Sequence, residues 1–389
     1  MRVVLVHDWL NGMRGGEKVL EAFAAIFPES KIYTLFCDPE KISSDLKRHS
    51  ITTSFIQHIP KRKKYYQHFL PLFPKAIESF KFDNADLVIS SSHCVAKGAI
   101  VGTHTLHICY CHSPMRYIWD RFDDYFPKGQ INFIRYKFIQ AIAGYIRKWD
   151  IKTSKRVDLF IANSNFVRWR INKYYNRPAR VIYPPVDTDY FIPGQVQNND
   201  YFLTVSAIVP YKKIDLVVEA FRDLKERLVV VGNGPDLFKL INKAPQNVTF
   251  TGWIDKEKLR EYYRNCKALI FPGVEDFGIA PVEAQACGKP VIAFYEGGVK
   301  DTVIGPVIDN LNSFDGPITG LFFKNQTVED IKKSVDIFSK INFNEDENRN
   351  NAMRFSNRNF YNQIKDFLTE AVSIFRQQGK INLEARLMK

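Results

Sequence analysis

The stretch EDFGIAPVE, residues 275–283, decides the fold of the second half of this chain. It places two carboxylates, Glu275 and Glu283, on either side of a glycine-containing turn. The apolar run at residues 268–271 predicts a buried strand before it, and Pro281 suits the first position of a helix after it. The stretch is therefore predicted to connect a strand to a short helix, as in a parallel α/β sheet.

Such a loop directs backbone N–H groups toward a ligand above the sheet edge, which favours a phosphate. Carboxylates repel a phosphate but accept hydrogen bonds from hydroxyls, so the pattern fits a nucleotide-sugar, with hydroxyls on both sides of a diphosphate. Structural roles stay open: Glu283 near the third helical position suits the helix dipole, and Glu275 could cap a turn. A glycosidase-like acid and nucleophile pair is disfavoured, because no aromatic-lined sugar groove is evident nearby.

Working outward, apolar strand-like runs alternate with helical patterns along the chain, which predicts parallel sheets covered on both faces. The polar, proline-containing segment 184–200 separates two such series. We therefore predict two doubly wound α/β domains, residues 1–185 and 186–371, with a C-terminal helix at about 372–389 packing back on the first. Ligands of such sheets bind at the carboxyl ends of the strands, so the site is expected in a cleft between the domains. The predicted strands are Val3–His7, Lys31–Phe36, Leu87–Ser90, Leu106–Tyr110, Leu159–Ala162, Arg180–Tyr183, Phe202–Ser206, Leu228–Val231, Val248–Thr251, Ala268–Phe271, Pro290–Phe294 and Gly320–Phe323.

Length and composition agree with this organisation. The 389 residues suit two domains, and 45% hydrophobic with 25% charged residues is typical of a globular protein. No apolar stretch is long enough to span a membrane, and the first residues carry charge too early for a signal peptide. The six scattered cysteines are expected to be buried free thiols in a reducing cytoplasm.

A net charge of +13 calls for an anionic partner. The basic residues include the run KRKK at 61–64, and residues 131–150 predict a basic helix. Its apolar residues recur at steps of three or four: Ile134, Phe138, Ile142, Tyr145 and Trp149. This pattern is expected of a helix on an anionic membrane surface, and the alternative is an ordinary core-facing helix. No nucleic-acid module is recognisable, so nucleic acid is not an expected partner.

Gly15 and Gly16 lie between the first strand and the predicted helix Glu17–Phe27. Glycines at such a turn let the backbone approach a phosphate, although a purely structural turn is equally compatible. The loop matches neither a dinucleotide fingerprint nor a P-loop.

Lys212 and Lys213 follow Pro210, where the spacing of Ile214 and Val217 predicts the start of a helix. Cations in a first helical turn are disfavoured by the dipole, so an anion sharing the site would explain them. We expect Lys212 to contact phosphate, and simple solvent exposure is the alternative.

All eight histidines lie in the first 112 residues. His112 follows the predicted strand at 106–110 and is expected at a strand's carboxyl end, where it could position a substrate group. His7, which ends the first strand, is a similar but weaker candidate. A structural role is the alternative for each.

The run EDFGIAPVEAQACGKPVIA, residues 275–293, resembles the E-x7-E signature of retaining glycosyltransferases of family 4, which have the GT-B fold. The resemblance extends over almost the entire chain. It includes the Gly15-Gly16 loop, the His112 loop, and the segments ANS at 162–164, VIYPPVD at 181–187 and VPYKKID at 209–215. The openings HDWL at 7–10 and CYCHSPMRY at 109–117 resemble a narrower branch, the bacterial mannosyltransferases of O-antigen and exopolysaccharide assembly.

The resemblance implies roles for individual residues. Glu275 would hold hydroxyls of the transferred sugar, and Glu283 those of the ribose. Lys212 and Gly16 would contact the diphosphate, and His112 would contact the transferred sugar. The donor-binding set also includes Gly15, Phe277, Gly278, Ile279 and Ala280, with the last three offering backbone N–H groups to the diphosphate. One departure is Ala207, where the family usually carries an arginine; Lys213 or Arg14 could replace it.

The resemblance thus implies a metal-independent, retaining hexosyltransferase without a cofactor, moving mannose from GDP-mannose to a lipid-linked glycan acceptor. It would work in the cytoplasm, peripherally on the cytoplasmic face of the inner membrane. Two alternatives stay open: a GT-B-like nucleotide-sugar epimerase and a non-catalytic nucleotide-sugar-binding subunit.

Overall fold

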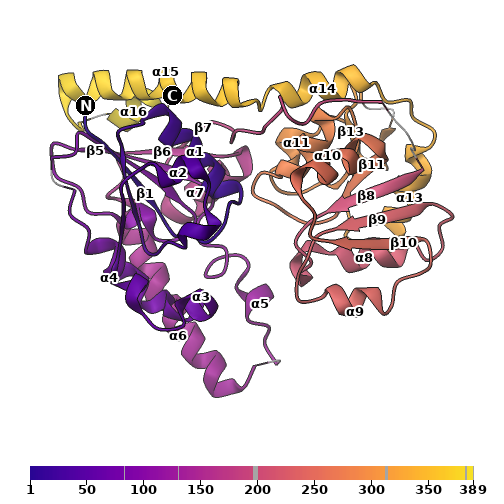
Figure 1. The fold of residues 1–389 in the computed structure, drawn as a ribbon, viewed down its shortest axis with the longest axis horizontal. Helices are drawn as coiled ribbons and strands as arrows, with labels where there is room; N and C mark the ends of the chain where they lie inside the picture. Colours follow the sequence, from indigo (N-terminus) through magenta and orange to yellow (C-terminus); the bar gives the residue numbers. More distant parts are fainter. Residues whose placement is uncertain (83, 130, 196–199, 312–313, 382, 389) are drawn as a thin grey trace. The chain divides into compact units, whose positions relative to one another are not determined.

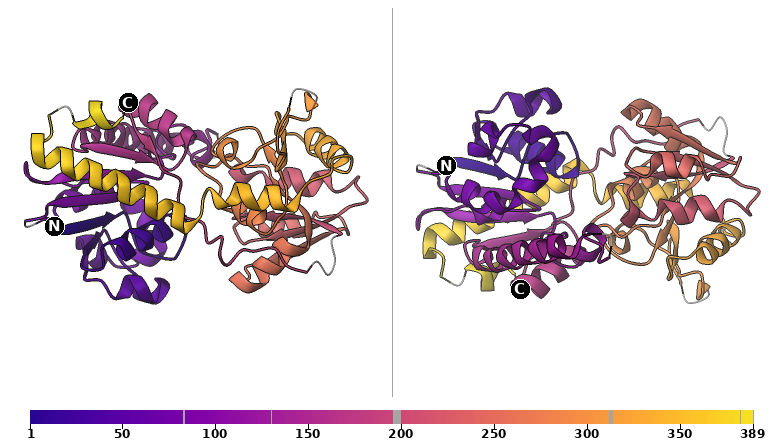
Figure 2. Two further views of the ribbon diagram at one scale, coloured as in Figure 1. Left: turned by 90° about the horizontal axis from the view of Figure 1, so that it is seen from above. Right: turned by 90° about the horizontal axis from the view of Figure 1, so that it is seen from below.

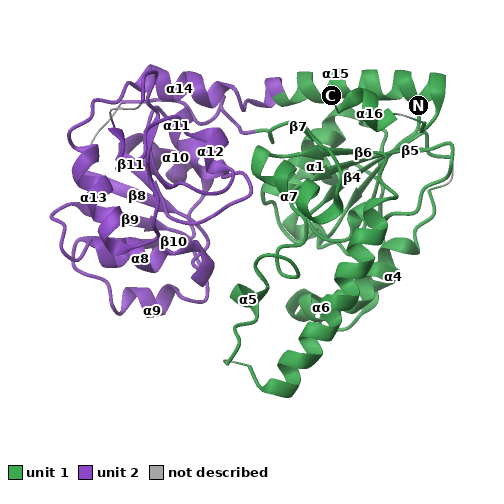
Figure 3. Ribbon diagram, turned by 180° about the vertical axis from the view of Figure 1, so that it is seen from behind, with its two compact units in different colours: residues 1–185, 360–389 green, residues 186–359 purple. Residues whose placement is uncertain are grey.

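The computed structural model describes residues 1–82, 84–129, 131–195, 200–311, 314–381 and 383–388. Figure 1 gives the labels of the helices and strands. The chain forms two compact units, which are coloured separately in Figure 3. Unit 1 comprises residues 1–185 and 360–389, and unit 2 comprises residues 186–359. The division after residue 185 lies where the polar segment predicts it, whereas the return to unit 1 begins at Phe360, earlier than residue 372.

Unit 1 contains a parallel sheet of seven strands in the order β3-β2-β1-β4-β5-β6-β7. The order reverses direction between β1 and β4, which makes that point a topological switch. The strands are β1 (Val3–His7), β2 (Lys31–Thr34), β3 (Ile51–Thr53), β4 (Leu87–Ser92), β5 (Leu106–Cys111), β6 (Leu159–Ala162) and β7 (Arg180–Val181). Strand β3 was not predicted, because its residues Ile51, Thr52 and Thr53 form no apolar run.

Both faces of the unit 1 sheet are buried, as alternation along β1 shows. Val3 and Leu5 join one hydrophobic cluster, and Val4 and Val6 join another. The first cluster includes residues of α1 and α15, and the second includes residues of α4 and α6. Figure 2 shows α15 lying along one face of this sheet. The helices of unit 1 are α1 (Gly15–Ile26), α2 (Ser44–Lys47), α3 (Arg62–Tyr65), α4 (Phe73–Glu78), α5 (Phe122–Tyr125), α6 (Phe133–Ser154), α7 (Asn165–Tyr175) and α16 (Leu383–Leu387), with the 3₁₀ turns η1 (Pro39–Lys41), η2 (Phe55–His58), η3 (Tyr66–Leu72) and η4 (Ala96–Gly98).

Helix α15 (Asn357–Gln378) begins in unit 2 and continues into unit 1. Its buried side chains recur at helical spacing: Phe360, Ile364, Phe367, Leu368 and Ala371. They share the cluster of Leu20 and Phe23 on α1, so the core of unit 1 includes residues from both ends of the chain.

Unit 2 contains a parallel sheet of six strands in the order β10-β9-β8-β11-β12-β13. Its order also reverses next to the first strand of the unit, here between β8 and β11. The strands are β8 (Tyr201–Val205), β9 (Arg227–Val231), β10 (Val248–Gly252), β11 (Cys266–Phe271), β12 (Val291–Phe294) and β13 (Gly320–Phe323). The helices are α8 (Ile214–Ala220), α9 (Leu237–Ile241), α10 (Lys256–Asn265), α11 (Ile279–Ala286), α12 (Val299–Thr302), α13 (Val328–Phe338) and α14 (Glu345–Met353), with the 3₁₀ turn η5 (Pro210–Lys212).

Two further predictions can be compared with the fold. All six cysteines are buried free thiols, as expected. No helix among the described residues has the length and apolar character needed to cross a membrane.

Candidate active site

In unit 2, Lys212 and Glu275 meet at the carboxyl edge of the sheet. Lys212 follows β8 and Glu275 follows β11, so the two residues lie on either side of the topological switch. Their side chains form an ion pair between Lys212 Nζ and Glu275 Oε1, and they are 15% and 14% exposed. The two candidates that the sequence identifies separately therefore form one charged pair, at the position where open α/β sheets bind ligands.

The local structure at Lys212 differs from the prediction. The chain forms the 3₁₀ turn Pro210–Lys212, Lys213 adopts φ +57°, and helix α8 begins at Ile214. Lys212 thus lies on a separate turn before the helix, and the macrodipole argument for an anion was wrong. The anion beside its ammonium group is the carboxylate of Glu275.

The backbone of Glu275 is fixed by the loop after β12. Its carbonyl oxygen accepts a hydrogen bond of 2.8 Å from the amide of Gly298. Gly297 has φ +89°, and a Cβ there would lie 2.4 Å from the same oxygen. Only glycine can provide this conformation and this close approach together, so the loop holds Glu275 against the sheet edge.

Helix α11 begins at Ile279, and its N-cap Gly278 has φ +92°. Pro281 is therefore the third helical residue rather than the first, and Glu283 is the fifth rather than the third. Gly278 has no side-chain oxygen for the N–H groups of the first turn, which leaves these groups suited to a phosphate. The helix ends at Ala286, and Gly288 follows with φ +81°, a left-handed conformation that stops a helix.

The helix-dipole explanation of Glu283 fails with this shift, since the dipole acts mainly within the first turn. Instead, the hydroxyl of the buried Tyr263 donates a hydrogen bond of 3.0 Å to Glu283 Oε2. Phe277 is also buried, with its ring 5.5 Å from that of Phe355, so its side chain belongs to the core of unit 2.

In unit 1, His7 ends β1 and His112 directly follows β5 at the corresponding edge. The hydroxyl of Ser91 on β4 lies 3.1 Å from His7 Nδ1 and 2.7 Å from His112 Nε2. Burial lowers the pKa of His7 and, more strongly, that of His112, whose pKa is lowered further by His93 and His7. Both imidazoles are therefore neutral at physiological pH and can exchange hydrogen bonds without carrying charge.

Gly16 lies close to both rings. A Cβ on Gly16 would stand 3.6 Å from His112 Nε2 and 3.6 Å from His7 Cε1. Helix α1 begins at Gly15, two residues earlier than predicted, so both glycines belong to its first turn. The structure thus brings Gly15, Gly16, His7 and His112 to one place, as the strand ends predict.

Asp8 is a buried residue of this edge that the sequence interpretation missed. Its Oδ2 accepts hydrogen bonds from the amides of His93 and Cys94, and its Oδ1 accepts from those of Val95 and Ala96. His93 Nδ1 also lies 3.1 Å from Oδ2. Asp8 directly follows β1, and His93 directly follows β4. Their positions just after two predicted strands are the signal that could have identified them.

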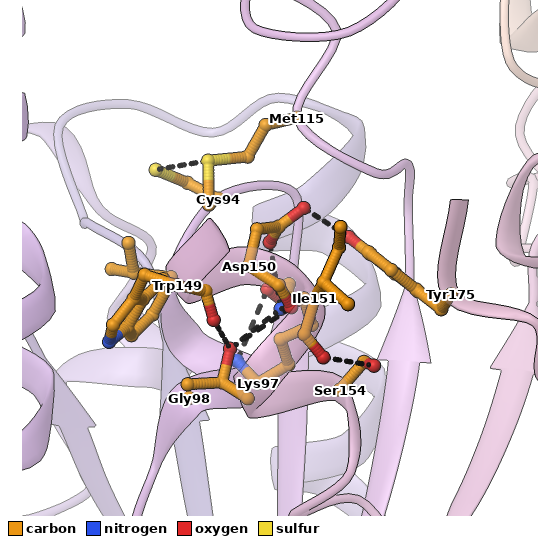
Figure 4. Close-up of polar contacts among 12 residues, drawn as sticks. Cys94, Lys97, Gly98, Met115, Trp149, Asp150, Ile151, Ser154 and Tyr175 are labelled. Atoms are coloured by element: carbon orange, nitrogen blue, oxygen red, sulfur yellow. Dashed lines mark hydrogen bonds and ion pairs between the residues drawn. The ribbon is translucent and has the colours of Figure 1, made fainter. Parts of the chain in front are cut away.

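Lys97 fixes the far end of the same segment (Figure 4). Its buried ammonium group lies 2.7 Å from Asp150 Oδ1 and donates to the hydroxyl of Thr153 at 3.0 Å. Asp150 Oδ2 accepts hydrogen bonds of 2.9 Å from the hydroxyl of Tyr175 and the indole N–H of Trp119. A buried ion pair with hydrogen-bonded partners is costly to break, so residues 93–97 are held between Asp8 and α6.

Ala207, at the position where the resemblance implies an arginine, is exposed after β8. Of the two bases proposed to replace that arginine, Lys213 directly follows Lys212 in unit 2. Arg14 is the N-cap of α1 in unit 1.

Two family models match this chain. One, "Glycosyl transferases group 1", matches residues 186–357, and the other, "Glycosyltransferase Family 4", matches residues 15–190. Together they cover all strands of both sheets except β1, and all predicted donor-binding residues; His7 and Asp8 lie before the matched range. The chain belongs to the glycosyltransferases of group 1 and family 4.

Individual relatives of this glycosyltransferase are more distant. An uncharacterized glycosyltransferase of Methanocaldococcus jannaschii is 27% identical over 183 residues, which covers 46% of this chain and 48% of the relative. A GDP-mannose-dependent alpha-(1-6)-phosphatidylinositol monomannoside mannosyltransferase of Mycolicibacterium smegmatis is 31% identical over 159 residues, 32% of this chain and 42% of the relative. The chain thus spans less than half the length of these curated relatives.

The fold is shared with solved glycosyltransferase structures. The Anabaena protein HepE, solved in complex with UDP and glucose, aligns with a TM-score of 0.64 at 16% identity. The alignment covers 94% of this chain and 99% of HepE. The two sheets are accordingly the two Rossmann-like domains of the GT-B fold, as the resemblance implies.

Proposed function

We propose that this glycosyltransferase transfers a hexose with retention of configuration, and that the donor is GDP-mannose. The proposed acceptor is a lipid-linked glycan in O-antigen, capsule or exopolysaccharide assembly. The observation that carries the proposal is the Lys212–Glu275 pair at the switch point of unit 2, beside the N-terminus of α11. The mannosyltransferase relative of Mycolicibacterium smegmatis favours GDP-mannose, and HepE, which has also been solved in complex with UDP-glucose, makes UDP-glucose the alternative donor.

The pair can change partners when a donor binds. A diphosphate offers Lys212 a stronger anionic partner than a single carboxylate, and the N–H groups at the start of α11 attract the same phosphates. Glu275 is then released to accept hydrogen bonds from hydroxyls of the transferred sugar. Glu283, oriented by Tyr263, accepts those of the ribose.

In this arrangement Lys212 and the helix N-terminus stabilise the negative charge that develops on the departing diphosphate, so the reaction needs no metal ion. His112, neutral because burial lowers its pKa, contacts the transferred sugar without adding positive charge. We expect the acceptor to attack the donor sugar from the face that the diphosphate leaves, since no enzymic nucleophile is evident in the motif.

A donor screen tests the proposal. The chain is incubated with GDP-, UDP- and ADP-sugars, with and without extracted lipid-linked acceptors, and both nucleoside diphosphate release and glycan extension are measured. Glycan extension with release of GDP from GDP-mannose is the expected result. Isomerisation of the sugar without an acceptor would favour the epimerase, and binding without turnover would favour the non-catalytic subunit.

We also propose an anionic membrane surface as a partner, on the basis of α6. Ile134, Phe138 and Tyr145, three of the residues predicted on its apolar face, are 78%, 65% and 54% exposed. Trp149 is buried, and the opposite residues Tyr136, Ala143 and Ile146 pack in the core. The core-facing alternative is therefore wrong for Ile134, Phe138 and Tyr145. The N-terminal part of the helix projects from unit 1 in Figure 1.

Basic side chains accompany this exposed surface. Arg135 and Lys137 are exposed on α6, and Lys61, Lys63 and Lys64 are exposed at α3 in the same unit. Arg62 is excluded from this set, because it is mostly buried and forms an ion pair of 2.7 Å with Asp38. Exposed aromatic residues among cations are the combination that binds a bilayer with anionic lipids, here the cytoplasmic face of the inner membrane.

Vesicle sedimentation tests the membrane proposal. Ile134→Ser with Phe138→Ser should lower binding to phosphatidylglycerol-containing vesicles at least about tenfold, since each side chain contributes about 1.5–3 kcal/mol when fully buried. Phe238→Ser is the matched control, because Phe238 is 77% exposed in unit 2. Equal binding of the double variant and the control would contradict the proposal. It would also be contradicted if the wild type bound vesicles of phosphatidylcholine alone as well as those that contain phosphatidylglycerol.

A further inference from the structure

Asp8 and His93 form a second pair across a topological switch, this time in unit 1. They follow β1 and β4, the two strands between which the order of the sheet reverses. Ligands of open α/β sheets bind in the crevice at this point. The proposed roles of Glu275, Glu283, Lys212, Gly16 and His112 leave both residues unused.

The carboxylate of Asp8 is fixed by its surroundings. It is fully buried and accepts hydrogen bonds from four successive backbone amides, residues 93–96, at 2.6 to 2.9 Å. The segment that supplies these amides is anchored at Lys97 by the buried pair with Asp150 (Figure 4). An acceptor that is held in this way can orient a neighbouring imidazole.

The imidazole of His93 is oriented through one nitrogen and open at the other. Its Nδ1 lies 3.1 Å from Asp8 Oδ2, so Nδ1 carries a proton and donates a hydrogen bond to the carboxylate. Its ring packs edge-on against Trp9, with the ring centroids 4.6 Å apart, which restricts rotation. The side chain is 32% exposed, and Nε2 has no hydrogen-bond partner within the described part of the chain.

His93 differs from the neighbouring histidines in its hydrogen-bond partner. His7 and His112 both contact the hydroxyl of Ser91, whereas His93 contacts the carboxylate of Asp8. In the neutral state, His93 thus presents an unprotonated Nε2 beside a fixed carboxylate, which is the arrangement of a general base and its orienting partner.

We propose that His93 binds the nucleophilic hydroxyl of the acceptor through Nε2 and takes its proton during glycosyl transfer. The acceptor oxygen forms the bond to the anomeric carbon, and the bond from that carbon to the phosphate oxygen breaks with its electron pair on the diphosphate. The hydroxyl proton moves to Nε2, and Asp8 stabilises the resulting imidazolium until the proton passes to water. The inference rests on the proposed transferase function and adds to it the group that activates the acceptor.

Two amide variants test this assignment, because each replaces one ring nitrogen. His93→Asn retains a donor near the position of Nδ1 and lacks a group at Nε2, whereas His93→Gln places an amide oxygen near Nε2. Release of nucleoside diphosphate is measured with the donor found in the screen, with water as the acceptor and with added octyl α-D-mannopyranoside. Binding of the nucleotide is measured by calorimetry.

We expect His93→Asn to lower turnover about 10²- to 10⁴-fold, the range that a positioned general base contributes. His93→Gln should recover about tenfold of that loss, since its oxygen can still bind the hydroxyl. Nucleotide affinity should change less than about twofold, because Lys212 and Glu283 are intact. His104→Ala is the control and should behave as the wild type, since His104 is exposed outside the site.

Wild-type turnover in His93→Asn would overturn the inference and leave the transferase function intact. Equal losses in the Asn and Gln variants would also overturn it, because they would indicate a structural role. A wild-type protein that neither binds nor hydrolyses any nucleotide-sugar would overturn the transferase function itself, and this inference with it.

Discussion

Unit 1 and unit 2 have the same strand order around their switch points but carry different groups there. In unit 2, Lys212 and Glu275 form an ion pair of two charged side chains. In unit 1, the carboxylate of Asp8 accepts hydrogen bonds from backbone amides and lies 3.1 Å from His93 Nδ1. Burial lowers the pKa of the nearby His7 and His112, so these two imidazoles are neutral. The same sheet edge can therefore serve different chemistry: the unit 2 edge suits a charged diphosphate, and the unit 1 edge suits neutral hydroxyl groups.

A large loss of turnover is expected from removing the positive charge of the unit 2 pair. Lys212→Ala should lower kcat about 10²- to 10³-fold, since it removes one preorganised group that stabilises the leaving diphosphate. Steady-state kinetics with the donor from the screen measures this loss. Lys239→Ala is a matched control, because Lys239 is exposed on α9. Near-normal turnover of Lys212→Ala would show that the charged edge is not the donor site.

In unit 1 the corresponding change should act on stability. Asp8→Asn replaces one of the two acceptor oxygens by an amide donor facing backbone N–H groups, and each buried unsatisfied donor costs about 1–3 kcal/mol. Denaturant unfolding followed by tryptophan fluorescence measures this, since four of the five tryptophans lie in unit 1. A free energy of unfolding within about 0.5 kcal/mol of the wild type would contradict the role assigned to Asp8.

Acid should distinguish the two units. Burial lowers the pKa of His7 and His112 from the ordinary 6.5, and lowers that of His107 to about 3. Below about pH 6.5 the unfolded chain thus binds protons that the folded chain does not, so stability falls as pH decreases, by up to about 1.4 kcal/mol per pH unit for each group.

All eight histidines lie in unit 1, so this loss should affect unit 1 alone. Thermal unfolding between pH 7 and pH 5 is followed by tryptophan fluorescence for unit 1 and by circular dichroism for the whole chain. If the tryptophan transition does not move to lower temperature over this range, the buried histidines do not control the acid stability of unit 1.

The smallest effect is expected at Glu283. Tyr263→Phe removes the hydrogen bond from the tyrosine hydroxyl to the Glu283 carboxylate, and such a bond contributes about 0.5–1.5 kcal/mol. The change should weaken nucleotide binding a few-fold while kcat is retained. Calorimetry with GDP and UDP measures the affinity. A large fall in kcat with unchanged affinity would place Glu283 in the chemical step instead of in ribose binding.

The sequence predicted the strands of both sheets well, because buried parallel strands are continuous apolar runs. Val3–His7, Leu159–Ala162 and Gly320–Phe323 have the predicted bounds. Helix starts were less accurate: the first helical residues were predicted at Glu17 and Pro281 and lie at Gly15 and Ile279. Glycine precedes or begins both helices, and it is compatible with loop and with helical dihedral angles, so it does not mark the first helical residue.

The candidate residues were predicted individually, but their pairing was not. The spacing of Lys212 and Glu275 in the sequence contains no information on their contact, which depends on β8 and β11 being neighbours. Asp8 was missed for the same reason, because its amide partners lie more than 80 positions later. The spacing of apolar residues correctly predicted the helix α6, but it did not identify which of those residues the core would bury.

The path of α15 has a consequence for how this protein is made. Unit 1 is the first to be synthesised, but Phe360, Ile364 and Phe367 belong to its hydrophobic core and are added only after unit 2. Domains generally fold in order as they leave the ribosome. Here residues 186–359 can fold before unit 1 is complete, because part of one face of the unit 1 sheet lacks α15 until residue 360 and those after it are made. A nascent chain stalled before residue 360 would therefore expose apolar surface and be a target for chaperones.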